Sequence, residues 1–271
     1  MSIRSYLSIF FLLTFSLVKS QSFENVSLVN KKMESYPFNE SNAYLSDDGN
    51  TLFFSSSDNR NNTYGLSDMN DIWYRNKNNG VWGTPINLRE VNTIENDVIL
   101  GLYKNDLIIL RNGSIDYYDI NNQYKLKRTE KIDGFPPNYN LISGSINYSQ
   151  DKLFLSFEGF GTYGVEDIYT SKKNNNVWGR LTNIGSSVNS EYQDISPFLY
   201  KEDTLVFISN RDEVGYELYF TVLKDEFWSE PLKMNLLNTS KSEASLTYDY
   251  NSDNFILSAT TDSKTNSDLF L

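Results

Sequence analysis

The stretch that decides the fold runs from Leu45 to Leu88. It reads LSDDG at 45–49, LFFSS at 52–56, DIW at 71–73 and VWGTPINL at 81–88. Short runs rich in aromatic and branched aliphatic residues, bounded by Asp, Asn and Gly, are typical of β-strands joined by tight turns. This stretch therefore predicts four short strands separated by turns, and we find no amphipathic helical run elsewhere in the chain.

The same unit recurs along the chain with a period of about fifty residues, which is typical of repeat architectures. The apolar anchor of its second segment recurs at Leu52, Leu107, Leu153, Leu205 and Phe255. The acidic-aliphatic-aromatic segment recurs at Asp71–Trp73, Asp167–Tyr169, Glu217–Tyr219 and Asp268–Phe270, with a looser version at Asp116–Tyr118. The tryptophan marker recurs at Trp82, Trp178 and Trp228, and the second repeat has Tyr124 instead. Five repeats are visible, always with their parts in the same order.

Five repeats of four strands predict an all-β fold, a five-bladed β-propeller of four-stranded antiparallel blades. Apolar runs such as LIIL at 107–110 and LFL at 153–155 suit strands that neighbouring blades bury on both faces. We expect a single propeller domain over residues 21–271.

Both ends of the chain favour closure of the ring by an N-terminal strand. The last repeat stops at DLFL (268–271), after its third segment. The missing fourth segment is supplied by FENVSLV at Phe23–Val29, which has the same span as Trp82–Leu88. An N-terminal strand that completes the last blade leaves no unpaired sheet edge there.

The first twenty residues have the pattern of a secretory signal peptide. A basic residue, Arg4, precedes an apolar stretch from Tyr6 to Val18, and Ser20 suits cleavage just after it. This stretch is shorter than a membrane-spanning helix requires, so we expect an exported protein that does not span the membrane after cleavage. Export without any cysteine favours a bacterial envelope, in the periplasm or associated with the outer membrane.

Composition excludes several classes of function. The formal net charge is −11, and no basic cluster is present, so nucleic acid is not an expected partner. The absence of histidine excludes Ser-His nucleophile pairs and the usual zinc sites. The acidic turn Asp47–Asn50 does not fit the calcium-loop template, and we expect no metal and no cofactor.

The pattern LSxDGxxLxFxS, followed by Asp-Ile-Tyr and by WGxPxNL, resembles the TolB-type WD-like propeller repeat over essentially the whole mature chain. The first repeat matches best, the fourth keeps ISPFL at 195–199, and the second has lost nearly all of the pattern. Such repeats are similar to those in envelope proteins of Bacteroidota, where they often accompany OmpA-like domains in gliding and type IX secretion machinery. The resemblance implies a protein-binding module of the periplasm or cell surface.

Four acidic residues stand at equivalent places, ten to twelve positions before the second-segment anchor: Glu40, Asp97, Asp194 and Glu243. At these places they would form an acidic ring near one mouth of the central channel, able to bind a cation or the basic groups of a peptide. The alternative, which we favour, is that each carboxylate caps local backbone amides or pairs with an arginine such as Arg60 or Arg211.

The repeat pattern fails at Gly134–Tyr139, a Pro-stiffened segment that carries Phe135 and Tyr139. Two aromatic side chains on such a loop would lose little entropy on binding and could anchor a partner. Relaxed drift in a blade that only has to close the ring explains the irregularity equally well.

Taken together, these features favour a non-catalytic protein-binding or scaffold propeller, with an outer-membrane secretion or motility complex as the expected partner. The enzyme alternative is a glycoside hydrolase that uses Asp97, Asp194 and Glu243 as acid and base. Against it, these residues follow the repeat, whereas catalytic residues should break it. A glycan-binding propeller is a third hypothesis.

Overall fold

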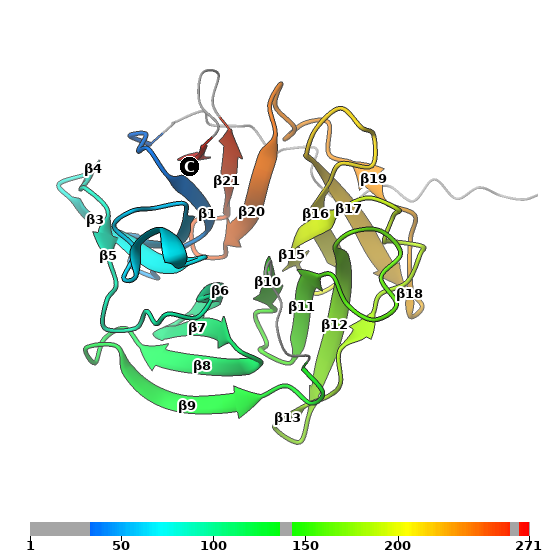
Figure 1. The fold of residues 1–271 in the computed structure, drawn as a ribbon, viewed down its shortest axis with the longest axis horizontal. Helices are drawn as coiled ribbons and strands as arrows, with labels where there is room; N and C mark the ends of the chain where they lie inside the picture. Colours follow the sequence, from blue (N-terminus) through cyan, green and yellow to red (C-terminus); the bar gives the residue numbers. More distant parts are fainter. Residues whose placement is uncertain (1–32, 136–142, 261–265, 271) are drawn as a thin grey trace, which may run out of the picture.

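The computed structural model describes residues 33–135, 143–260 and 266–270. These residues form five antiparallel sheets arranged as blades around a central axis, as Figure 1 shows. The predicted five-bladed β-propeller is therefore confirmed. Strands β1, β6, β10, β15 and β20 lie closest to the axis (Figure 1).

The strands are numbered in chain order, and each blade takes consecutive ones. Blade 1 contains β1 (Asn39–Leu45), β2 (Thr51–Ser57), β3 (Asp71–Asn78), β4 (Val81–Trp82) and β5 (Ile86–Asn87), with a short 3-10 turn, η1 (Gly65–Ser67), between β2 and β3. Blade 2 contains β6 (Val98–Tyr103), β7 (Asp106–Arg111), β8 (Ser114–Asp119) and β9 (Lys125–Lys131). Blade 3 contains β10 (Ser143–Ile146), β11 (Lys152–Phe157), β12 (Asp167–Asn174), β13 (Val177–Trp178) and β14 (Thr182–Asn183).

Blade 4 contains β15 (Asp194–Tyr200), β16 (Thr204–Ser209), β17 (Glu217–Lys224), β18 (Phe227–Trp228) and β19 (Leu232–Lys233). Blade 5 contains β20 (Glu243–Asp249), β21 (Asn254–Thr260) and β22 (Ser267–Phe270). In blades 1, 3 and 4 the outer strand is interrupted, so two short strands pair with the third strand of the blade. In blade 2 the outer strand β9 is continuous.

The repeated tryptophans pack between neighbouring blades. Trp178 of blade 3 is fully buried in a cluster with blade 2, and its indole Nε1 donates to Glu130 Oε2 on β9 at 2.8 Å. Trp228 of blade 4 packs edge-on against Phe154 of blade 3. The repeating tryptophan therefore ties each of these blades to the one before it.

The first and last blades meet directly and close the ring. Asn42 N on β1 donates to Ser245 Oγ on β20 at 2.8 Å, and Met33 N donates to Leu269 O on β22 at 3.1 Å. Ser258 Oγ and Ser267 Oγ of blade 5 both donate to the carbonyl oxygen of Glu40. The segment expected to complete blade 5, Phe23–Val29, lies outside the described residues, as does the predicted signal peptide.

Candidate functional site

The strongest candidate site is a pocket of about 500 Å³ where the central channel opens. Its walls come from the inner strands of blades 1 to 4 and from three loops that join second and third strands, 58–70, 158–166 and 210–216. We call this end of the propeller the loop face. Because blades that are not neighbours share the pocket, it lies on the axis of the ring.

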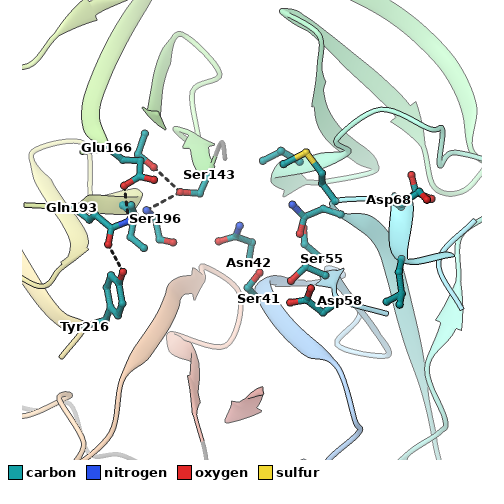
Figure 2. Close-up of a pocket in the computed structure, with 18 residues that line it drawn as sticks. Ser41, Asn42, Ser55, Asp58, Asp68, Ser143, Glu166, Gln193, Ser196 and Tyr216 are labelled. Atoms are coloured by element: carbon teal, nitrogen blue, oxygen red, sulfur yellow. Dashed lines mark hydrogen bonds between the residues drawn. The ribbon is translucent and has the colours of Figure 1, made fainter. Parts of the chain in front are cut away.

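The inner strands line the pocket with hydroxyl and amide groups. Ser41 and Asn42 come from β1, Ser143 from β10 and Ser196 from β15, and Figure 2 shows Asn42 extending from blade 1 toward the opposite side. Asn42 and Ser196 have positive φ values, 48° and 51°, at bulges that interrupt the pairing of β1 and β15. A β-bulge redirects a side chain and its amide, and here it places polar groups at the axis.

Carboxylates supply the charge of the pocket. Asp58, Asp68 and Glu166 line it, and its lining contains no Lys or Arg. Glu166 Oε2 accepts from Gln193 Nε2 at 2.6 Å, and Gln193 in turn accepts from the hydroxyl of Tyr216 (Figure 2). Asp58 Oδ2 accepts from Asn39 Nδ2 at 2.8 Å. The pocket therefore has an excess of acceptors and a negative charge.

Tyrosines fill the opposite end of the channel. Tyr148, after β10, contacts Tyr103 of β6 and Tyr250 after β20, with ring centroids 5.4 and 5.0 Å apart. Tyr248 links Tyr250 to Tyr200 on β15, at 5.0 and 4.8 Å. Contact between blade 3 and blade 5, which are not neighbours, can be made only across the axis. A ligand would therefore enter the pocket from the loop face.

The four acidic residues of the predicted ring stand where the repeat places them, at the starts of β1, β6, β15 and β20. Their side chains, however, are buried: Glu40, Asp97 and Asp194 are 0% exposed and Glu243 is 2% exposed. None of the four lines the pocket. They do not present an open acidic ring to the channel mouth.

The contacts of these carboxylates match the alternative interpretation. Asp97, Asp194 and Glu243 each accept the backbone N–H of the residue four positions earlier, at 2.6–2.7 Å. Asp194 Oδ1 pairs with Arg211 Nη2 at 2.5 Å, and Asp97 Oδ1 pairs with Arg111 Nε at 2.5 Å. These residues cap the loops that enter the inner strands.

Glu40 pairs with Arg75 on β3 and not with Arg60, which is exposed on the 58–70 loop. Burial raises the pKa of Glu40 to about 7, although the charge of Arg75 opposes the shift. Burial likewise raises the pKa of Asp97 to about 6 and that of Glu243 above its usual range. A substrate does not reach these side chains in this structure, so the hydrolase alternative would have to use other carboxylates.

Phe135 is half-buried, and its role as an anchor for a partner stays a prediction. It packs against the core of blades 2 and 3, and its ring covers Gly113, where a Cβ would come within 2.6 Å of it. Tyr139 lies outside the described residues.

The pocket residues Asn42, Ser196 and Glu166 were not predicted from the sequence. A bulge leaves no reliable mark in the sequence, because most residues can occupy it when the neighbouring blade supplies partners. Ser196 does belong to the ISPFL segment, so that segment was an available signal.

No group of three or more Asp, Glu, His or Cys side chains able to hold a metal occurs in the described part of the chain. Within the same residues, no helix has the length and apolar character needed to cross a membrane.

No protein-family model matches the chain, and no curated protein matches it. Among solved structures, the chain is similar in fold to prolyl endopeptidases described in a study of inter-domain dynamics, with 15% identity and a TM-score of 0.41, over 86% of this chain and 32% of theirs. It is also similar to prolyl oligopeptidase B from Galerina marginata, with 10% identity and a TM-score of 0.40, over 82% of this chain and 32% of that one. The chain thus spans about a third of the length of these peptidases, and likeness at this level concerns the propeller fold alone.

Proposed function

We propose that this protein is a non-catalytic binding module of the bacterial cell envelope, which holds a protein partner on its loop face. The observation that carries the proposal is the set of exposed apolar side chains on the loops around the pocket. Leu66 is 62% exposed, Phe160 is 100% exposed and Val214 is 81% exposed, and they come from blades 1, 3 and 4 respectively. Tyr64, Tyr163 and Val165 on the same loops are also about half exposed.

Large apolar side chains exposed on several neighbouring loops favour a protein partner. A single exposed apolar residue is ordinary, but apolar side chains gathered on one face around a depression are typical of an interaction site. Aromatic residues are also enriched among those that dominate binding energy at interfaces.

Three other exposed apolar side chains are arranged differently. Val81, Val177 and Phe227 occupy equivalent positions, each on the outer strand of a separate blade. They begin the outer strands of their blades, away from the loops that join second and third strands. They provide a matched control, because their substitution changes exposed apolar area without touching the loop face.

The envelope location and a role with outer-membrane secretion or motility machinery are supported by the signal-like N-terminus and by the resemblance of the repeats. The partner is then a protein of that membrane or of the periplasm.

The test is affinity capture of the mature protein from detergent-solubilised envelopes of its native host. We expect a stoichiometric protein partner with the wild type, and its loss with Phe160→Ser/Val214→Ser. The control Val177→Ser/Phe227→Ser should retain the partner. Equal capture by all three proteins would contradict the loop face as the docking surface.

A further inference from the structure

We infer that the pocket on the loop face binds the side chain of a lysine or arginine from the docked polypeptide. This inference rests on the proposed function, because it assumes that a polypeptide reaches the loop face. It adds the chemical class of residue that the partner must present. The argument uses the charge of the pocket, its unsatisfied polar groups and its apolar walls.

Two carboxylates of the pocket, the exposed Asp58 and Glu166, which is 7% exposed, have no basic partner. Asp58 and Glu166 stand on opposite sides of the mouth (Figure 2), and neither pairs with a Lys or Arg among the described residues. One carboxylate oxygen of each residue accepts a hydrogen bond from a side-chain amide. The other oxygen has no donor among the described residues. Two such carboxylates attract a cation and repel an anion, and a hydrogen bond between charged groups is about twice as strong as a neutral one.

A buried hydroxyl in the pocket wall also lacks a partner. Ser55 on β2 is 2% exposed, lines the pocket, and its Oγ makes no hydrogen bond among the described residues. The equivalent serine of blade 3, Ser156, shares a hydrogen bond of 2.7 Å with Ser143, whose Oγ also accepts from Ser196 N at 2.8 Å. Buried polar groups are rarely left without a partner. Ser55 can therefore accept a hydrogen bond from a ligand, whereas Ser156 already has a hydrogen-bond partner in Ser143.

The apolar part of the wall suits the stem of a long basic side chain. Leu66, Met69, Val98 and Ile195 line the pocket between its polar groups. Lys and Arg bury their methylene stems against apolar surface and keep the charged end among polar groups. A sugar, by contrast, usually stacks on aromatic rings, and Tyr216 is the single aromatic residue of the lining, with its hydroxyl bound to Gln193.

Other basic groups on the loop face do not occupy the pocket. Arg60 is exposed on the 58–70 loop, and Lys241 lies half-buried before β20, but neither lines the pocket. Arg211 is engaged by Asp194. The negative charge of the pocket is therefore available to a partner.

The experiment is a screen of the mature protein against a positional-scanning library of octapeptides that are acetylated and amidated, so that their termini carry no charge. We expect Arg or Lys to be selected at one position. In the best peptide, replacing arginine by its neutral isostere citrulline, or lysine by acetyl-lysine, should weaken binding roughly tenfold. Raising the salt concentration should weaken the binding of the charged peptide more than that of the neutral one.

The variant Asp58→Asn/Glu166→Gln should bind the charged and the neutral peptide equally. The control Asp47→Asn/Glu226→Gln, which changes two exposed acids away from the pocket, should keep the preference for charge. Peptides bound without preference for Arg or Lys, but lost with Phe160→Ser/Val214→Ser, would overturn the inference and leave the proposed function standing. No peptide selected, or selection of a neutral oligosaccharide from a glycan array, would overturn it as well, and the capture experiment then judges the proposed function separately.

Discussion

Individual carboxylates in this propeller have two separate roles. Those at the starts of the inner strands are buried and accept from backbone amides or pair with arginines. Asp58, Asp68 and Glu166 around the pocket have no basic partner among the described residues. The partners of the carboxylates decide between the roles, because a carboxylate that is paired with an arginine inside the fold cannot meet a ligand. Acidic residues of the same chain therefore differ in what they can bind.

The internal role of Asp194 can be tested by its removal. Asp194→Ala removes the carboxylate partner of Arg211 and the acceptor of the Ser190 amide, and breaking a buried ion pair typically costs about 3 kcal/mol. We expect a loss of that size in the free energy of unfolding measured in urea. Glu202→Gln, at the exposed pair with Lys152, should cost less than about 1 kcal/mol. An unchanged stability of Asp194→Ala would show that its carboxylate is not needed by the fold.

Asp68 lies close to Asp71, and its surroundings raise its pKa. The Oδ1 atoms of both are buried and have no hydrogen-bond partner among the described residues, while their Oδ2 atoms accept from the amides of Tyr64 and Thr63 at 2.6 Å. Burial, followed by the charge of Asp71, raises the pKa of Asp68, although the Tyr64 amide opposes the shift. The folded state therefore holds the Asp68 proton to a higher pH than the unfolded state does.

Because that pKa is raised, the contribution of Asp68 to stability is present at low pH and is lost as the pH rises above the unfolded value of about 3.9. Asp68→Asn mimics the protonated carboxyl and can donate to Asp71. We expect this variant to be more stable than the wild type by about 1 kcal/mol at pH 8, with a smaller difference near pH 4. Thermal unfolding at both pH values measures this, and a gain that is independent of pH would contradict a proton held at Asp68.

At the scale of the elements, the outer strands hold neighbouring blades together through their tryptophans. Trp178 fills the space between blades 2 and 3 and is fully buried. Phe227, on the outer strand β18 of blade 4, is 78% exposed. The two aromatic residues therefore differ in burial although both lie on outer strands. Sequence spacing marks the tryptophan as the repeated feature, and packing explains why it is repeated.

Trp178→Ala should cost about 4 kcal/mol of unfolding free energy, because it opens a cavity and leaves Glu130 without the indole donor. Phe227→Ala should change stability by less than about 0.5 kcal/mol. Chemical denaturation of both variants measures the difference. Similar values for the two would contradict a specific role of the tryptophan in joining blades.

At the scale of the whole molecule, stability depends on the junction of the first and last blades. The inner strands form a continuous ring, since each contacts its neighbours on both sides, including β1 with β20. Hydrogen bonds from blade 5 reach the carbonyl oxygen of Glu40 on β1. The junction joins residues more than two hundred positions apart, so it closes by contacts between distant parts of the chain.

Deleting Phe23–Val29, the segment expected to complete blade 5, should lower the midpoint of thermal unfolding and expose the edge of β22. Amide hydrogen exchange should show the loss first in β21 and β22, because protection is lost locally before global unfolding. The protein that lacks residues 1–20 alone provides the reference. An unchanged midpoint and unchanged exchange would contradict closure by the N-terminal strand.

The sequence by itself determined the number of blades, their strand order and the inner position of the four acidic residues. It could do so because a period of about fifty residues repeats every local signal, so that turns, strands and markers reinforce one another. The tertiary structure alone decided which polar groups face the axis. Ser41, Asn42, Ser143 and Ser196 meet there only when blades 1, 3 and 4 come together. The bulges that turn Asn42 and Ser196 inward depend on partners from neighbouring blades.

The dependence on distant parts of the chain also explains why the acidic residues predicted to bind a ligand are covered, while other acidic residues line the pocket. Glu40 and Asp194 look available in the sequence, yet arginines from β3 and from the loop after β16 cover them. Asp58 and Glu166 lie in loops without a repeat signature and line the pocket. Burial and access are properties of the assembled ring, because they depend on side chains that are distant in the chain, and no local pattern records them.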